Sequence, residues 1–178
     1  MKYTNQNVIN YFKCLEKYLN DFSKVQTTVG VHADKGKDVV DKAVWNEFGT
    51  EHTSRGYKFI KNGVEYKIKK GTLIKIPERP FVRLFLYPDA VLKIKNELAK
   101  NVETMALGHK RLKQPLKAVT HTMDNIGRVA KELMKAKMTN PNNYKKNADL
   151  TIAIKGFDYP LYDTGELLSS IDSRLERR

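Results

Sequence analysis

Asn46-Glu47-Phe48-Gly49-Thr50 closes a helical pattern, and Ile76-Pro77-Glu78-Arg79-Pro80-Phe81-Val82-Arg83 resumes the main chain after an insert. Gly49 follows the last apolar residue of the helix, where a left-handed C-terminal cap requires glycine. The two prolines of the second stretch bias the residues before them towards extended conformations, and Phe81 is expected in the core. Neither stretch pairs a nucleophile with a base. We therefore interpret both as structural, with Asn46, Phe48, Gly49, Pro77, Arg79, Pro80 and Phe81 holding the junction between sheet and helix.

A third stretch near the C-terminus reads Tyr159-Pro160-Leu161-Tyr162-Asp163-Thr164-Gly165-Glu166-Leu167-Leu168-Ser169-Ser170-Ile171. Asp163 or Thr164 is a good helix N-cap, and Glu166 stands three residues after Asp163, the spacing of a capping box. Gly165 then lies in the first turn. The apolar residues that follow are expected to dock this short helix, and residues 173–178 either complete a strand or fray.

Apolar periodicity predicts helices at about 8–22, 39–48, 88–105 and 116–133, because apolar residues recur there every three or four positions. The β-branched stretch 27–31 predicts a short strand. Together these patterns predict an α+β fold, in which three to four helices pack on a small antiparallel or mixed sheet.

Residues 51–76 have a different character and predict a protruding β-hairpin arm. The stretches 57–61 and 64–68 flank Asn62-Gly63, a strong hairpin signal, and 72–76 predicts a further strand. The alternating lysines and aromatic residues fit either a solvent-exposed face or contact with a neighbouring subunit. The candidate interface residues of this arm are Tyr57, Phe59, Asn62, Gly63 and Tyr66.

Length and composition predict one domain over 1–178, because 178 residues of which 40% are hydrophobic can bury one core. Within it we distinguish the hairpin arm (51–76), a polar flexible loop (139–149) and a C-terminal motif segment (150–178). No apolar run is long enough to span a membrane. The lone Cys14 fits a reducing cytoplasm.

The net charge of +13, from 33 basic and 20 acidic residues, raises the possibility of a polyanionic partner, nucleic acid first. The alternative is a lysine-rich solvated surface, because lysine is spread along the whole chain. No arginine-rich stretch interleaved with aromatic residues suggests a platform for stacking single-stranded bases.

Enzymatic signals are weak. The triplet Asp163-Thr164-Gly165 matches the catalytic triplet of aspartic proteases, but only thirteen residues follow Gly165, too few for the rest of that fold. The four histidines are isolated, with no paired-cysteine or HExxH pattern. We expect no enzymatic activity, no metal and no cofactor.

Taken in order, the three stretches resemble the head–tail joining and tail-completion proteins of long-tailed bacteriophages, also called minor neck or virion-morphogenesis proteins. That family carries an Asn-Glu-Phe-Gly-Thr-like helix end, an Ile-Pro-x-Arg-Pro-Phe-x-Arg-like stretch that leads into a long helix, and a C-terminal Pro-Leu-x-Asp-Thr-Gly-x-Leu-x-x-Ser-Ile-like segment. The likeness extends from residue 29 to 171. The insert at 51–75 is longer than the corresponding loop of the family.

The resemblance implies a structural virion protein that is assembled in the host cytoplasm. Its subunits would form a homo-oligomeric ring, a hexamer or dodecamer, at the head–tail junction, where the ring completes or terminates the tail. The implied partners are the tail-tube protein and a head connector, adaptor or stopper protein, with transient contact to DNA in the lumen and none to a membrane. In this interpretation Asp163, Thr164 and Gly165 orient the C-terminal helix, and the arm reaches a neighbour. The alternative is a basic nucleic-acid-binding protein.

Overall fold

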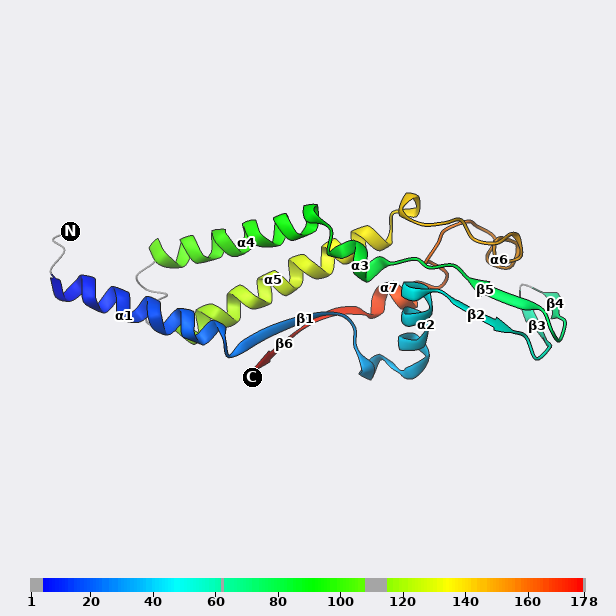
Figure 1. The fold of residues 1–178 in the computed structure, drawn as a ribbon, viewed down its shortest axis with the longest axis horizontal. Coiled ribbons are helices and arrows are strands. Elements are labelled where there is room, and N and C mark those ends of the chain that lie inside the picture. The colour runs from blue at the N-terminus through cyan, green and yellow to red at the C-terminus, as the bar shows by residue number, and fades with distance from the viewer. Residues whose placement is uncertain (1–4, 62, 108–114, 178) are drawn as a thin grey trace. The chain divides into compact units, whose positions relative to one another are not determined.

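A computed structural model of the chain describes residues 5–61, 63–107 and 115–177 (Figure 1). The fold is α+β, as predicted from the sequence. The chain forms two compact units, one from residues 1–30, 86–133 and 172–178 and the other from 31–85 and 134–171. Each unit is described by itself below, and the single domain over 1–178 stays a prediction.

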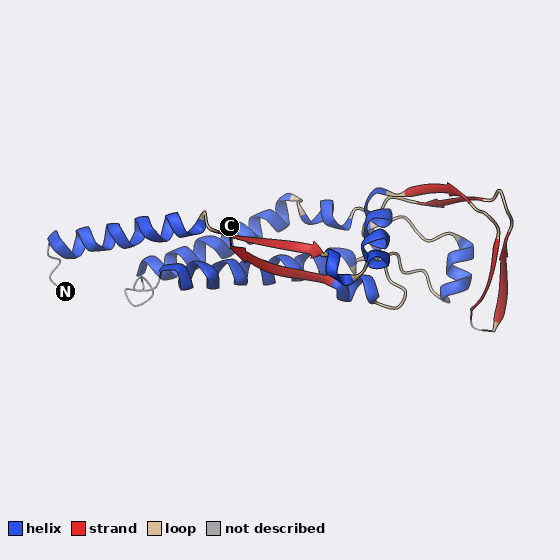
Figure 2. Cartoon of the chain, turned by 90° about the horizontal axis from the view of Figure 1, so that it is seen from below, coloured by secondary structure: helices blue, strands red, loops and turns tan. Residues whose placement is uncertain are grey.

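The first unit combines long helices with a two-stranded sheet. Its helices are α1 (Asn5–Phe22), α4 (Pro88–Leu107) and the N-terminal part of α5 (Pro115–Met138). Strand β1 (Val25–Val31) pairs with β6 (Ile171–Arg177), and the two arrows run in opposite directions in Figure 2. The C-terminal residues thus complete a strand, one of the two alternatives that the sequence left open.

A glycine lets α5 approach this sheet closely. A Cβ on Gly127 would lie 2.6 Å from Thr27 Cγ2 of β1 and 3.2 Å from Ser173 Cβ of β6. The Thr27 hydroxyl donates a hydrogen bond to the Met123 carbonyl at 3.0 Å. Beside this contact Tyr18, Val25 and Val119 form a buried cluster. Glycine in α5 therefore serves close packing, although it lowers helix propensity.

The apolar stripe predicted on α1 is only half covered. Leu15 and Phe22 pack against the buried cluster with Tyr18, whereas Phe12 is 61% exposed and Leu19 is 56% exposed. The buried face of α1 is therefore centred on Leu15, Tyr18 and Phe22, and is rotated about the helix axis from the apolar face predicted by periodicity. Ile9, Phe12 and Leu19 of α1 are exposed to solvent in the isolated chain.

The second unit contains the three sequence motifs. Helix α2 (Lys37–Phe48) follows the short helix η1 (Ala33–Lys35) and packs against α3 (Phe81–Phe85) and α7 (Glu166–Ser170). The turn η3 (Pro141–Asn143) and helix α6 (Asp149–Lys155) lie between α5 and the C-terminal motif. Phe81 is fully buried, as expected, as are Met134, Met138 and Ile171.

The predicted arm consists of two antiparallel strand pairs in succession. Strand β2 (Thr50–Thr53) pairs with β5 (Leu73–Ile76), and β3 (Tyr57–Lys61) pairs with β4 (Val64–Ile68). Figure 1 shows β2 and β5 side by side as a stem, with β3 and β4 beyond them. Hydrogen bonds of 2.8 Å and 2.9 Å between the backbones of residues 54 and 71–72 close the stem where the second pair begins.

Candidate assembly site

Gly49 joins α2 to β2 with a positive φ of 71°, a region that favours glycine. Its ψ of 165° shows that the chain turns directly into the strand, so the left-handed cap predicted here is wrong. The reason for glycine is space as well as φ, because a Cβ would lie 3.0 Å from the Glu78 nitrogen and 3.1 Å from the Ile76 carbonyl oxygen. The absence of a side chain at Gly49 therefore lets the segments 46–50 and 76–83 contact each other.

Glu47 links the segments 46–50 and 76–83 through hydrogen bonds. Glu47 is only 5% exposed, and its carboxylate accepts hydrogen bonds from the backbone N–H groups of Val82 at 2.8 Å and Arg83 at 3.0 Å. These are the free donors at the start of α3, so Glu47 caps that helix from a distant segment. The Arg83 side chain donates to the same carboxylate at 2.9 Å and also pairs with Glu78 at 2.6 Å.

Glu47 and Arg83 were not among the residues singled out from the sequence. The sequence did contain a signal for Glu47, because it follows Val39 and Ala43 at helical spacing and so places an acidic residue on the buried side of α2. Phe48, by contrast, was expected to hold the junction between sheet and helix. Its ring is 64% exposed and lies 5.1 Å from the Arg83 guanidinium carbon. Glu47 points inward in the structure. Consecutive residues of a helix are rotated by about 100°, so Phe48 points outward.

Arg79 connects the clasp, defined here as residues 46–50 and 76–83, to the segment before α6. Its backbone N–H donates to the Asn46 carbonyl at 2.7 Å. Its guanidinium is buried and donates to the Lys145 and Lys146 carbonyls and, at 3.1 Å, to the Asn147 side-chain oxygen. Burial lowers the pKa of Arg79, which the charge of Asp158 partly opposes. Pro77 and Pro80 flank Arg79 in this turn, and both are half-buried.

The loop predicted at 139–149 is tied to its surroundings at several points. Asn147 donates to the Asp158 carboxylate through its backbone and its side chain, each at 3.0 Å. Tyr144 donates to the Lys137 carbonyl at 3.0 Å, and the Tyr159 hydroxyl donates to the Thr139 carbonyl. The segment also contains the turn η3 and the first residue of α6.

The capping box predicted in the C-terminal motif is wrong. Gly165, in a left-handed conformation with φ 81°, occupies the N-cap position of α7, and no side chain caps that position. The Thr164 hydroxyl is 3.4 Å from the Glu166 nitrogen. Asp163 and Glu166 instead pair with lysines from elsewhere in the unit. Lys61 lies 3.4 Å from Asp163, and Lys42 lies 2.7 Å from Glu166.

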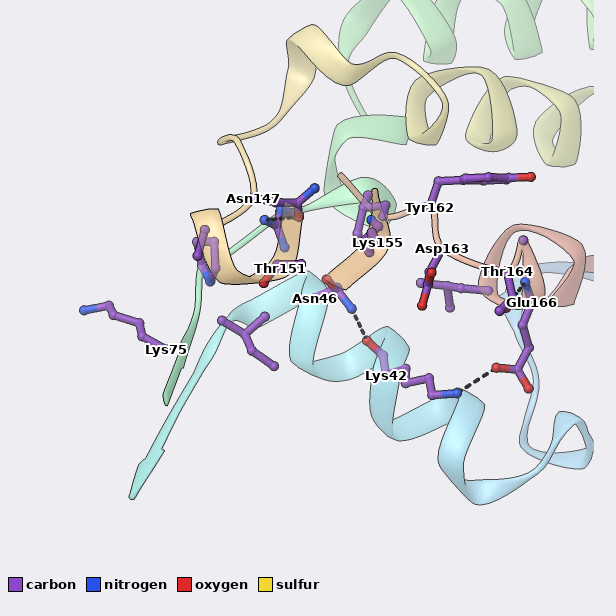
Figure 3. A pocket seen from close by; sticks show the side chains of 17 residues that line it. Lys42, Asn46, Lys75, Asn147, Thr151, Lys155, Tyr162, Asp163, Thr164 and Glu166 are labelled. Carbon is purple, nitrogen blue, oxygen red and sulfur yellow. Dashed lines mark hydrogen bonds and ion pairs between the residues drawn. The ribbon is translucent and has the colours of Figure 1, made fainter. Parts of the chain in front are cut away.

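The clasp and the C-terminal motif meet around one hollow of about 400 Å³ (Figure 3). Six of the residues singled out from the sequence line it: Asn46, Pro77, Arg79, Asp163, Thr164 and Gly165. Lys42, Asn147, Thr151 and Lys155 also line it and were not among the candidate residues predicted from the sequence. Burial lowers the pKa of Lys155. We define these lining residues, with their neighbours on α6 and α7, as the motif pocket.

The hairpin at the end of the arm has two different faces. Phe59 and Tyr66 stack with ring centroids 5.3 Å apart, and the Tyr66 hydroxyl lies 3.5 Å from the Ala153 carbonyl of α6. On the other face Ile60 is 76% exposed. Tyr57 is exposed, Gly63 has a positive φ of 77°, and Asn62 lies outside the described residues. Within this unit, part of the aromatic face therefore contacts α6 of its own chain.

No protein family, curated protein or solved structure matches this chain. Among the described residues, no helix is long and apolar enough to cross a membrane. The same residues contain no group of three or more His, Cys, Asp or Glu side chains that could hold a metal ion.

Proposed function

We propose that this chain is a structural protein of a tailed-phage virion and forms a ring at the head–tail junction. The ring completes or terminates the tail and joins it to the head connector. The observation that carries the proposal is the order of three family-like motifs along the sequence, from 46–50 through 76–83 to 159–171.

The position of these motifs in the fold supports the proposal. Segments more than 80 residues apart in sequence meet at the motif pocket. The residues that join them are a helix-capping carboxylate, a buried arginine bonded to carbonyls and a sterically required glycine. Such groups fix backbone geometry. A subunit that must present the same surfaces to each neighbour in a ring requires fixed geometry of this kind.

Exposed apolar side chains give the proposal its second support. A ring is closed by heterologous contacts, so each subunit needs two different adhesive surfaces. Trp45 and Phe48 on α2 are exposed in one unit, and Phe12 and Leu19 on α1 are exposed in the other. Large aromatic side chains are frequent anchors of protein interfaces.

The test is the assembly state of the purified chain, measured by light scattering after size exclusion and by negative-stain imaging. We expect a closed ring with a central opening, and we expect mass spectrometry to find the chain in intact virions. A strict monomer at every concentration reached, together with absence from the virion, would overturn the proposal.

A specific observation favours nucleic-acid binding as the second candidate. Lys58, Lys67, Lys69 and Lys70 gather around a hollow of about 320 Å³ at the base of the β3–β4 hairpin, and all four are exposed. Clustered lysines of this kind bind phosphates without sequence preference.

A further inference from the structure

The charges around the motif pocket do not balance. Four cationic side chains line it: Lys42, Lys75, Arg79 and Lys155. Lys42 is paired with Glu166 at 2.7 Å, and Lys75 is paired with Glu51 at 3.2 Å. The remaining carboxylate of the lining, Asp163, is paired with Lys61.

Arg79 and Lys155 form direct hydrogen bonds to neutral groups only, although the charge of Asp158 acts on both and that of Asp163 acts on Lys155. Arg79 donates to two backbone carbonyls and to the Asn147 amide, and Lys155 donates to the Tyr159 carbonyl at 2.7 Å. Within residues 5–61, 63–107 and 115–177, neither side chain forms an ion pair with a carboxylate. Burial lowers the pKa of Lys155, the charges of Asp163 and Asp158 raise it, and the charges of Arg79 and Lys61 lower it.

Three cations, Arg79, Lys155 and Lys61, thus share two carboxylates, Asp158 and Asp163. Two of these cations, Arg79 and Lys155, are partly desolvated, and an uncompensated positive charge there is unfavourable in a folded protein. One further anionic group in the pocket would compensate it, and charge-assisted hydrogen bonds are the strongest that such groups form. We propose that the motif pocket is a binding site for a single carboxylate side chain of a partner polypeptide.

The rest of the lining favours a carboxylate side chain over a nucleic-acid backbone. Asp163 and Glu166 stand on the wall of the pocket, and their charges disfavour the closely spaced phosphates of a polyanion. Ile76, Pro77, Leu161 and Leu167 add an apolar lining, which suits the methylene groups of a glutamate. The identity of the partner as another virion polypeptide rests on the proposed function, whereas the carboxylate site itself does not.

The experiment is a titration of the isotope-labelled full chain followed by amide NMR. The probes are the capped tripeptide acetyl-Gly-Glu-Gly-amide, its Gln counterpart and inorganic phosphate, with a short DNA duplex as the fourth arm. We expect the Glu peptide to shift the signals of residues 147–155 and 161–167 saturably. We expect the Gln peptide and phosphate to bind at least about tenfold more weakly at the same signals, because only the Glu peptide offers both charge and methylene contacts.

Variants separate the site from general charge. Lys155→Met should weaken the Glu peptide about tenfold or more, and Lys155→Arg should retain most of the binding. The matched control is Lys93→Met, an exposed lysine of α4 outside the pocket. Thermal unfolding of each variant verifies that the fold is retained.

Three results would overturn the inference: no saturable shift, equal affinity for the Glu and Gln peptides, or a duplex or phosphate that binds these signals as tightly as the Glu peptide. Because the titration measures the isolated chain, its failure leaves ring formation untested and intact. A failure of ring formation alone likewise leaves the carboxylate site standing.

Discussion

The stability of the clasp depends most on Glu47, because its carboxylate bonds to the backbone and side chain of the second half of the clasp. Glu47→Ala removes the two hydrogen bonds to the start of α3 and leaves those N–H groups without their partner. We expect the free energy of unfolding to fall by about 1–2 kcal/mol, the usual cost of losing a helix cap. Urea titration followed by circular dichroism measures this change.

The matched control for Glu47 is Glu65→Ala. Glu65 forms an exposed ion pair with Lys58 at 2.9 Å, and such pairs contribute about 0–1 kcal/mol. If the two variants lost equal stability, Glu47 would be no more than a surface charge and the clasp would not be held as described.

Gly49 offers a second test at the same scale, because it combines positive φ with a close backbone neighbour. Gly49→Ala must place a Cβ 3.0 Å from the Glu78 nitrogen. Gly71→Ala also has a positive φ, 86°, but meets nothing within 4 Å. We expect Gly71→Ala to cost about 1 kcal/mol from φ alone and Gly49→Ala about 2–3 kcal/mol.

Chemical denaturation of both glycine variants measures the difference. If both variants lost the same free energy of unfolding, the backbone at Glu78 would be able to move away from the new Cβ at no cost. The first motif would then need glycine only for its dihedral angle, and the close contact between 49 and 78 would carry no weight in the clasp.

At the scale of elements, the sequence predicted the structures that depend on local pattern. The long helices and the hairpin strands 57–61 and 64–68 are confirmed. Strand β2 was not predicted, because residues 50–53 are polar and gain their strand character only from pairing with β5. Helix α3 was not predicted either, since its cap comes from Glu47, 34 residues before its first residue.

The candidate site shows the same division. The three sequence motifs predicted six lining residues of the motif pocket. The lysines of α2 and α6 could not be found, because a lysine on an amphipathic helix is ordinarily a solvated one and only tertiary structure brings these two together. The capping box at Asp163 was predicted from local sequence alone, whereas in the structure Asp163 pairs with Lys61, which is distant in sequence.

The arm gives the prediction that belongs to this scale. A deletion of 57–74 would remove half of β5. The structure offers a cleaner boundary, since Gly56 already lies against Lys70 and the backbone bonds between 54 and 71–72 close the stem. Deleting 57–69 and joining these ends should retain the fold, measured by circular dichroism and thermal unfolding, and stop ring or particle assembly.

The control for this deletion is Ile60→Ser, which alters the exposed face of the hairpin and leaves both strand pairs in place. If Ile60 contacts a neighbour, assembly weakens in this variant too. Normal virions from the deletion would refute a role of the arm in assembly, whereas loss of the monomer fold would show that the contacts with α6 and Asp163 support the unit.

For the whole molecule, the net charge of +13 must be reconciled with an assembly role. A basic surface gives nonspecific DNA affinity by counterion release, with dissociation constants of about 10⁻⁴–10⁻⁶ M at physiological salt. We expect the purified chain to bind a duplex in this weak range while it forms rings. Fluorescence anisotropy over a salt series measures both the affinity and the slope.

A triple variant, Lys67→Gln with Lys69→Gln and Lys70→Gln, decides between the two functions. Removing three phosphate contacts should reduce the magnitude of the slope of log K against log salt by about 3, since each contact contributes about 0.9. If DNA binding is incidental, the variant assembles into rings as the parent chain does. Tight binding by the parent chain without rings, abolished in the variant, would instead make nucleic acid the partner, because the hairpin lysines would then carry the function and not merely the charge.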